Sequence, residues 1–229
     1  MTNRPVALVT GATRGIGRAI AIELSSTHRI LVGGRDAARA GELVAELDDA
    51  APFVCDLADE DAVAAACAGI GRLDVLVHSA GIGRSNDIGL AARALWREVF
   101  ETNVFAVADL TRLLLPALEA ARGIVVAINS GAGFFSSPGG GVYAGSKFAL
   151  RALTDALREE MRGKVRVCSI HPGRTDTDMQ RELQAAMGNE HYNGSCYVSP
   201  GSVAAAVRLA VDTPDNATIE QLSIRPSVS

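Results

Sequence analysis

Apolar residues follow two alternating patterns along this chain: short continuous runs, and longer segments with helical spacing. The runs are bounded by Gly, Asp or Asn and predict strands that are buried on both faces. They lie at residues 6–10, 29–34, 52–55, 74–81, 123–130 and 165–173. Between them, Ala-rich stretches such as GRAIAIEL and FALRALTDALREEM repeat their apolar positions every three or four residues, which predicts amphipathic helices. Strand and helix therefore alternate along the chain.

This alternation predicts an α/β protein with a three-layer Rossmann fold, in which a doubly wound parallel sheet of about seven strands carries helices on both faces. A helix at about residues 200–212 and a short strand near residues 221–226 complete the sheet. The segment 174–199 has few strong periodic features and is predicted to be a lid or substrate loop. Ligands of such folds bind at the carboxyl ends of the strands, so functional residues are expected in the loops that follow them.

Composition narrows the class of protein. With 229 residues, 48% of them apolar, the chain can bury one large core, and a single domain over residues 1–229 is expected. The net charge is −4 and the basic residues are scattered, which argues against nucleic acid or membranes as partners. Four widely separated cysteines, the lack of an 18-residue apolar stretch and a start unlike a signal peptide predict a cytoplasmic protein. No cluster has metal-ligand spacing, so no metal site is predicted.

The first apolar run leads directly into a glycine-rich motif. Residues 10–17 read TGATRGIG and open into a predicted helix. Gly11 allows a tight turn, Gly15 allows the backbone to approach a pyrophosphate, and Gly17 allows helix and strand to pack closely. The helix N-terminus faces the negative charge. The motif therefore predicts a dinucleotide phosphate site.

The end of the second predicted strand bears on the choice of cofactor. A carboxylate at this position accepts a hydrogen bond from the ribose 2′-hydroxyl of NAD, whereas an arginine pairs with the 2′-phosphate of NADP. Here the strand ends in Gly34 and is followed by Arg35, and Arg14 is expected to reach the same phosphate. Asp36 is the competing signal, but it is interpreted as the N-cap of the next helix. NADP(H) is therefore the predicted cofactor, with NAD(H) as the alternative.

A tyrosine and a lysine stand four residues apart at a predicted helix start, which puts Tyr143 and Lys147 on one face. A carbonyl that accepts hydride develops negative charge and needs a proton donor whose pKa lies nearer neutrality than the value of about 10 for a phenol. Lys147, together with an oxidised nicotinamide, is expected to lower the pKa of Tyr143, which then acts as acid in reduction and base in oxidation. Ser130, at the end of the fifth strand, is positioned to hold the substrate oxygen.

These motifs resemble those of the short-chain dehydrogenase/reductase family, in its compact single-domain branch, over nearly the whole chain. TGATRGIG is similar to the family's TGxxxGxG loop, and Ser130, Tyr143 and Lys147 are similar to its catalytic triad. The resemblance implies that Asn103, within FETNVFAV, is the fourth catalytic residue. It also implies a helix distortion at Asn103 that holds a water linking Lys147 to solvent.

By the same resemblance, Asp56 and Leu57 contact the adenine, and the Pro172-Gly173 segment with Thr175 and Thr177 binds the nicotinamide carboxamide. The family's usual NNAG is replaced here by residues 78–81, HSAG, which keeps the Ala-Gly turn at the adenine ribose but lacks both asparagines. The cofactor contacts expected from motif and resemblance together are Gly11, Thr13, Arg14, Gly15, Ile16, Gly17, Arg35, Asp56, Leu57, Ser79, Ala80, Gly81, Tyr143, Lys147, Pro172, Gly173, Thr175 and Thr177.

Two histidines, His78 and His171, lie at strand ends and are interpreted as neutral core residues with their hydrogen bonds satisfied. Phe134 and Phe135 are expected to line the substrate pocket. The resemblance implies a homodimer or homotetramer formed through the helices at about residues 92–120 and 143–162.

The predicted function is therefore NADPH-dependent reduction of a ketone or aldehyde to an alcohol, as in a carbonyl reductase or alcohol dehydrogenase, with Tyr143 as general acid and base. Two alternatives stay open: a protein that senses the cofactor without turnover, and an epimerase or dehydratase built on the same scaffold.

Overall fold

The protein forms one seven-stranded sheet within the part of the chain that the computed structural model describes, residues 4–186, 188–189 and 191–227. Every neighbouring pair of strands is parallel, and the spatial order is 3-2-1-4-5-6-7. The predicted fold class is confirmed. The strands are β1 (Val6–Val9), β2 (Arg29–Gly34), β3 (Ala50–Val54), β4 (Val75–His78), β5 (Ile124–Ile128), β6 (Arg166–Pro172) and β7 (Gln221–Ile224).

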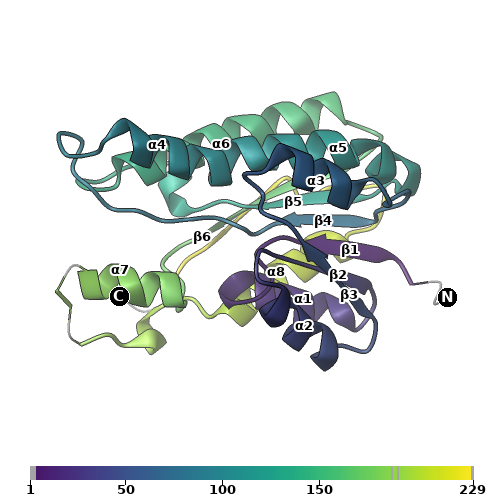
Figure 1. Cartoon of the computed structure of the whole chain (residues 1–229), viewed down its shortest axis with the longest axis horizontal. Helices are drawn as coiled ribbons and strands as arrows, with labels where there is room; N and C mark the ends of the chain where they lie inside the picture. The colour runs from purple at the N-terminus through teal and green to yellow at the C-terminus, as the bar shows by residue number, and fades with distance from the viewer. Residues whose placement is uncertain (1–3, 187, 190, 228–229) are drawn as a thin grey trace.

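Helices cover both faces of this sheet. The helices are α1 (Gly15–Ser25), α2 (Ala37–Glu46), α3 (Glu60–Cys67), α4 (Arg93–Phe100), α5 (Ala106–Ala121), α6 (Gly141–Glu160), α7 (Asp178–Ala186) and α8 (Pro200–Asp212). Figure 1 shows α1, α2 and α8 on one face, and α3, α5 and α6 on the other, with α4 beside α6. The described residues also form three short helical turns between these elements: the π-helix η1 (Glu101–Phe105) and the 3-10 helices η2 (Gly131–Gly133) and η3 (Gly194–Cys196).

Strand β1 explains why the strands have continuous apolar sequences. Its successive residues point to opposite faces, with Ala7 and Val9 packed in the core beneath α1 and α8, and Leu8 in the core beneath α5. All three side chains are fully buried. A strand covered on both faces has no solvent-facing position, so it lacks the alternation of a half-exposed strand.

The predicted helix at about residues 92–120 is interrupted. It consists of α4, the π-helical turn η1 and α5, and Asn103 lies in η1. The chain therefore contains the helix distortion that the family resemblance implies. Single π-helical turns within longer helices are frequent at functional sites.

The segment 174–199 is more regular than expected. Its residues 187 and 190 lie outside the described residues, as do residues 1–3, 228 and 229 of the predicted domain. The segment contains α7 and η3, and its role as a lid or substrate loop stays a prediction. Thr177 directly precedes α7 and caps it, because its Oγ1 accepts a hydrogen bond from Gln180 N at 3.3 Å. In Figure 1, α7 lies beyond the carboxyl ends of the strands.

Two further findings hold for the described residues only. None of their helices combines the length and the apolar character needed to cross a bilayer. No group of three or more His, Cys, Asp or Glu side chains among them is arranged to hold a metal ion.

Candidate active site

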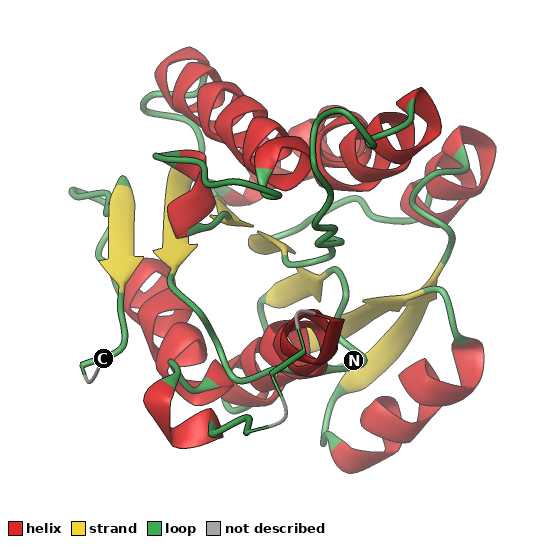
Figure 2. Cartoon of the chain, turned by 90° about the vertical axis from the view of Figure 1, so that its left-hand side faces the viewer, coloured by secondary structure: helices red, strands yellow, loops and turns green. Residues whose placement is uncertain are grey.

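A cleft with a volume of about 330 Å³ opens at the carboxyl end of the sheet, the end that faces the viewer in Figure 2. This volume is in the range of small-molecule and cofactor sites. Loops after β1, β2, β3 and β4 line it, together with the start of α7. The predicted contacts found in the lining are Gly11, Thr13, Arg14, Gly15, Ile16, Gly17, Arg35, Asp56, Leu57, Ser79, Ala80, Gly81 and Thr177.

Five of the predicted cofactor contacts are absent from the cleft lining: Tyr143, Lys147, Pro172, Gly173 and Thr175. Pro172 and Thr175 are buried, and Gly173 is partly buried. The Thr175 hydroxyl donates to Gly173 O at 3.1 Å. Thr177 does line the cleft. Its hydroxyl caps α7 by accepting from Gln180 N, and it donates to Thr175 O at 3.4 Å.

The glycine-rich loop leaves no room for side chains at two positions. Gly11 has a φ of +63°, and a Cβ there would lie 2.8 Å from Ala80 Cα. A Cβ on Gly17 would collide with the Gly11 carbonyl, so α1 begins directly against the strand end. The first turn of α1 contains no acidic residue. Its free N–H groups and positive dipole end therefore suit a pyrophosphate.

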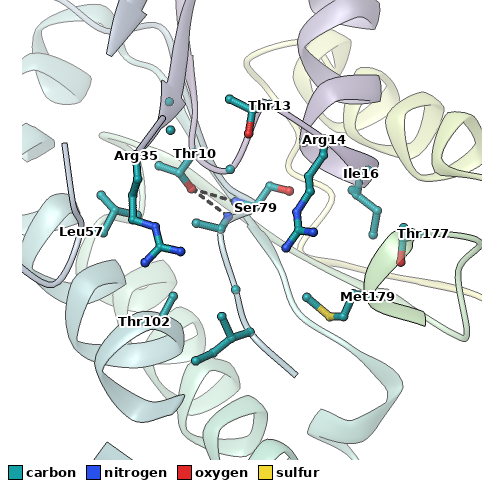
Figure 3. Close-up of a pocket in the computed structure, with 18 of the residues that line it drawn as sticks. Thr10, Thr13, Arg14, Ile16, Arg35, Leu57, Ser79, Thr102, Thr177 and Met179 are labelled. Atoms are coloured by element: carbon teal, nitrogen blue, oxygen red, sulfur yellow. Dashed lines mark hydrogen bonds between the residues drawn. The ribbon is translucent and has the colours of Figure 1, made fainter. Parts of the chain in front are cut away.

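Two arginines approach the cleft from opposite sides, as Figure 3 shows. The Arg35 guanidinium lies 4.0 Å from the Asp56 carboxylate, and the Arg14 guanidinium lies 3.8 Å from Glu182 on α7. Both arginine side chains are more than half exposed, at 75% and 53%. Since exposed ion pairs contribute little to stability, both guanidinium groups can exchange these partners for a phosphate.

The carboxylate of Asp36 is committed to the backbone. Its Oδ1 accepts hydrogen bonds from Ala38 N at 3.0 Å and Arg39 N at 3.2 Å, which caps α2 as expected. Asp36 is also absent from the cleft lining. The acidic residue that competed for the role of ribose ligand therefore has a structural role.

Thr10 was not among the predicted site residues, although it opens the TGATRGIG motif. Its Oγ1 accepts hydrogen bonds from Ser79 N and Ala80 N, both at 3.0 Å (dashed in Figure 3). The same hydroxyl donates to Val77 O at 3.3 Å. Thr10 thus fixes the turn after β4 against the glycine-rich loop. Residues outside the predicted motifs also line the cleft, among them Ile82, Arg84, Thr102 and Met179.

His78 occupies the position of the first family asparagine. Its Nε2 lies 2.9 Å from Thr111 Oγ1, and this hydroxyl donates its proton to Val107 O at 2.7 Å. Nε2 must therefore carry the proton that it donates to Thr111. Burial lowers the pKa of His78 to about 4. The histidine is neutral and links β4 to α5, in agreement with its interpretation as a satisfied core residue.

Ser130 and Tyr143 come together through their side chains. Ser130 Oγ accepts a hydrogen bond from Ala132 N at 3.1 Å, which leaves its own proton free to be donated. Burial raises the pKa of the half-buried Tyr143, and the hydrogen bond with the Ser130 side chain acts in the opposite direction. The serine thus stabilises the phenolate form of Tyr143.

Lys147 is almost fully buried on the same face of α6. Its Nζ lies 5.7 Å from the centre of the Tyr143 ring and donates a hydrogen bond to Ile128 O at 3.0 Å. Burial lowers the pKa of Lys147 to about 8. In the chain without cofactor, burial dominates and raises the pKa of Tyr143. The expected lowering by Lys147 together with an oxidised nicotinamide stays a prediction.

Asn103 joins three parts of the site. Its Nδ2 donates to Ile82 O and to Ser146 Oγ, both at 3.0 Å, and its Oδ1 accepts from Ile82 N at 2.9 Å. A Cβ on Gly81 would lie 3.2 Å from Asn103 Oδ1 and 3.9 Å from Lys147 Nζ. Gly81 lines the cleft, whereas none of the four predicted catalytic residues does. Asn103 and Lys147 therefore lie behind the cleft wall, next to Gly81.

Neither phenylalanine expected in the substrate pocket lines the cleft. The Phe134 ring packs against His171, with 4.3 Å between ring centres, and against the Arg151 guanidinium at 4.6 Å. Phe135 is 63% exposed.

Comparison with known proteins defines the family. The model of the short chain dehydrogenase family matches residues 5–188. Serine 3-dehydrogenase of Agrobacterium fabrum is 33% identical over 96% of this chain and 92% of its own length. The 3-oxoacyl-(acyl-carrier-protein) reductase of Pseudomonas aeruginosa is 35% identical over 79% of this chain and 78% of its own. The chain belongs to the short-chain dehydrogenase/reductase family.

A solved structure agrees with this assignment. A metagenomic short-chain oxidoreductase in complex with NADP superimposes with a TM-score of 0.82, at 33% identity and with 98% of each chain covered. The protein is therefore an oxidoreductase by family, and a similar protein holds NADP.

Proposed function

We propose that the chain is an NADPH-dependent carbonyl reductase, which transfers a hydride to a ketone or aldehyde and gives an alcohol. The observation that carries the proposal is the cluster that Tyr143 forms with Ser130 and Lys147, in which Lys147 lies next to Gly81 of the cleft lining. A phenol, a hydroxyl and an ammonium are the groups needed to protonate and orient a carbonyl oxygen.

The residues of the cleft fit a nicotinamide dinucleotide. The side-chain-free cradle at Gly11 and Gly17 suits its pyrophosphate, and the bound reduced nicotinamide supplies the hydride. Arg35 and Arg14 would hold the 2′-phosphate of NADPH. The Asp36 carboxylate, which could otherwise bind the ribose 2′-hydroxyl of NADH, caps α2 instead. This supports the preference for NADPH over NADH.

Ser130 and Tyr143 would act on the substrate oxygen. Ser130 Oγ accepts from Ala132 N, so its own proton is free and would be donated to the carbonyl. Tyr143 has its pKa above the ordinary phenol value, so it is protonated at neutral pH and delivers its proton as negative charge develops on the oxygen. In oxidation the same group accepts the proton.

Lys147 and Asn103 would complete the proton path. With a pKa of about 8, Lys147 remains mostly protonated at neutral pH, and its bond to Ile128 O leaves two N–H groups for a cofactor ribose and Tyr143. Asn103, in the π-helical turn, and Lys147 both lie next to Gly81, and we propose that a water there links the ammonium to solvent.

The names of two relatives guide the choice of substrate. Serine 3-dehydrogenase and 3-oxoacyl-(acyl-carrier-protein) reductase both act, by name, at carbon 3 of a carboxylic acid or acyl group. We therefore include 3-oxo esters and 3-hydroxy acids among the test compounds.

The experiment is a steady-state assay of NADPH consumption with aldehydes, ketones and 3-oxoacyl esters, with NADH in parallel. Wild type should turn over at least one class with NADPH preferred. Tyr143→Phe should bind NADPH with unchanged affinity and lose about a hundredfold or more in kcat. Tight NADPH binding without any turnover would instead favour a cofactor sensor, and equal use of NADH would refute the NADP preference.

We also propose a homodimer or homotetramer formed through α5 and α6. Phe105 in η1 and Phe148 on α6 are 54% and 44% exposed, which leaves apolar rings uncovered near these helices. Light scattering that finds only monomer would overturn this part of the proposal.

A further inference from the structure

His171 lies directly against the backbone of Ser130. It stands near the end of β6, has an exposure of 0%, and its Nδ1 is 3.1 Å from Ser130 O. A carbonyl oxygen only accepts hydrogen bonds, so Nδ1 carries the proton and donates it. The other ring nitrogen, Nε2, is buried and has no hydrogen-bond partner among the described residues.

The Ser130 peptide is held from both sides. Its N–H donates to Asn129 Oδ1 at 2.9 Å, and its carbonyl accepts from Gly133 N at 3.0 Å as well as from His171. The Asn129 and Gly133 contacts arise within the loop itself. The bond from His171 is different, because it comes from the neighbouring strand and ties the loop to the sheet.

The imidazole of His171 is fixed in orientation. Its ring packs on Phe134, which in turn packs on Arg151, and its backbone carbonyl accepts from Arg225 Nη1 at 2.8 Å. Burial lowers the pKa of His171, the charges of Arg151 and Arg225 add to that effect, and the Ser130 carbonyl and Asp155 oppose it. The ring is therefore neutral at physiological pH, with the lone pair on Nε2, which agrees with the lack of an acceptor there.

We propose that His171 is a positioning residue for the reaction: its Nδ1–H fixes the Ser130 peptide, and so directs the Ser130 hydroxyl towards Tyr143 and the substrate oxygen. This inference rests on the proposed role of Ser130 in carbonyl reduction. The structure thus assigns a mechanistic role to a residue that sequence alone marked only as a core histidine.

The test separates the hydrogen bond from the packing of the ring. His171→Phe keeps a ring against Phe134 and removes the donor, whereas His171→Asn keeps a donor amide and removes the ring. Reduction of ethyl acetoacetate by NADPH serves as the probe reaction. We expect His171→Phe to lower kcat about tenfold without changing the affinity for NADPH, and His171→Asn to stay within about threefold of wild type. The reverse order would show that ring packing alone matters and would overturn the proposal.

A double-mutant cycle with Ser130→Ala tests whether His171 acts through Ser130. If it does, His171→Phe causes almost no further loss of kcat once the hydroxyl is absent. Losses that multiply would overturn the proposal. If Ser130→Ala keeps the wild-type rate, the proposed function itself fails; if Ser130→Ala is slow but His171→Phe is as fast as wild type, only the inference about His171 fails.

A readout without substrate covers the case in which ethyl acetoacetate is not turned over. The tyrosinate absorbance of each protein, minus that of its Tyr143→Phe counterpart, gives the pKa of Tyr143. The hydrogen bond with the Ser130 side chain lowers the pKa of Tyr143. His171→Phe should weaken that bond and raise the pKa, whereas His171→Asn should leave it unchanged. An unchanged value in both would overturn the proposal. Thermal unfolding checks that each variant folds, and His171→Leu replaces His171→Phe if the larger ring does not fit.

Discussion

The histidine at position 78 should make the protein sensitive to mild acid. Burial lowers its pKa from 6.5 to about 4, so on acidification the unfolded chain binds a proton before the folded one. The stabilising effect is complete above the unfolded pKa of 6.5 and is lost as the pH falls towards 4. Each pH unit in that window removes up to about 1.4 kcal/mol, so a change from about pH 7.5 to about pH 5 removes about 2 kcal/mol from the free energy of unfolding.

His78→Asn isolates this effect, because asparagine does not titrate and is the residue usual in the family. Urea unfolding of both proteins at the two pH values gives the difference, and the two other histidines with lowered pKa, His28 and His171, act equally in both proteins. The variant can be less stable at neutral pH, since the bond to Thr111 is altered, but its stability should fall by about 2 kcal/mol less on acidification. Parallel pH dependence in the two proteins would refute the buried, neutral state of His78.

Three further changes test the cofactor cleft. Gly17→Ala forces a Cβ onto the Gly11 carbonyl and should abolish NADPH binding, as measured by cofactor fluorescence; normal affinity would mean that the loop and α1 do not pack as described. Arg35→Ala should weaken NADPH about tenfold and leave NADH unchanged, and an equal loss for both cofactors would argue against 2′-phosphate recognition. Asp36→Ala removes two capping bonds and should lower the free energy of unfolding by about 1 kcal/mol. Its NADPH-to-NADH preference should stay at the wild-type value, and an altered ratio would mean that Asp36 contacts the ribose.

The sequence was sufficient for the parts of the fold that depend on local pattern. The apolar runs predict the strands because both faces of the sheet are covered, and TGATRGIG predicts the phosphate loop because only glycine fits at Gly11 and Gly17. Helix α7 escaped prediction because its sequence is mostly polar and its start depends on the Thr177 hydroxyl. The start of β3 at Ala50, two residues earlier than expected, is set by its pairing with Ile30 of β2.

Contacts between distant residues were beyond the reach of sequence patterns. The pairing of Arg14 with Glu182 on α7, and of His171 with the Ser130 carbonyl, joins residues more than 40 positions apart. The raised pKa of Tyr143 has the same origin, because burial depends on every element packed around the phenol. The residue types predict the chemistry of the site, whereas the tertiary structure determines the protonation state and the orientation of each side chain.

The most direct test of hydride transfer follows the hydrogen itself. NADPH carrying deuterium on the transferred face of nicotinamide carbon 4 is incubated with the enzyme and a carbonyl substrate that it turns over, and the alcohol is analysed by mass spectrometry. The account predicts one deuterium at the carbinol carbon with wild type, and at least a hundredfold slower formation of that product with Tyr143→Phe. An alcohol without deuterium, or a product formed while NADPH is not consumed, would contradict the assignment as a carbonyl reductase.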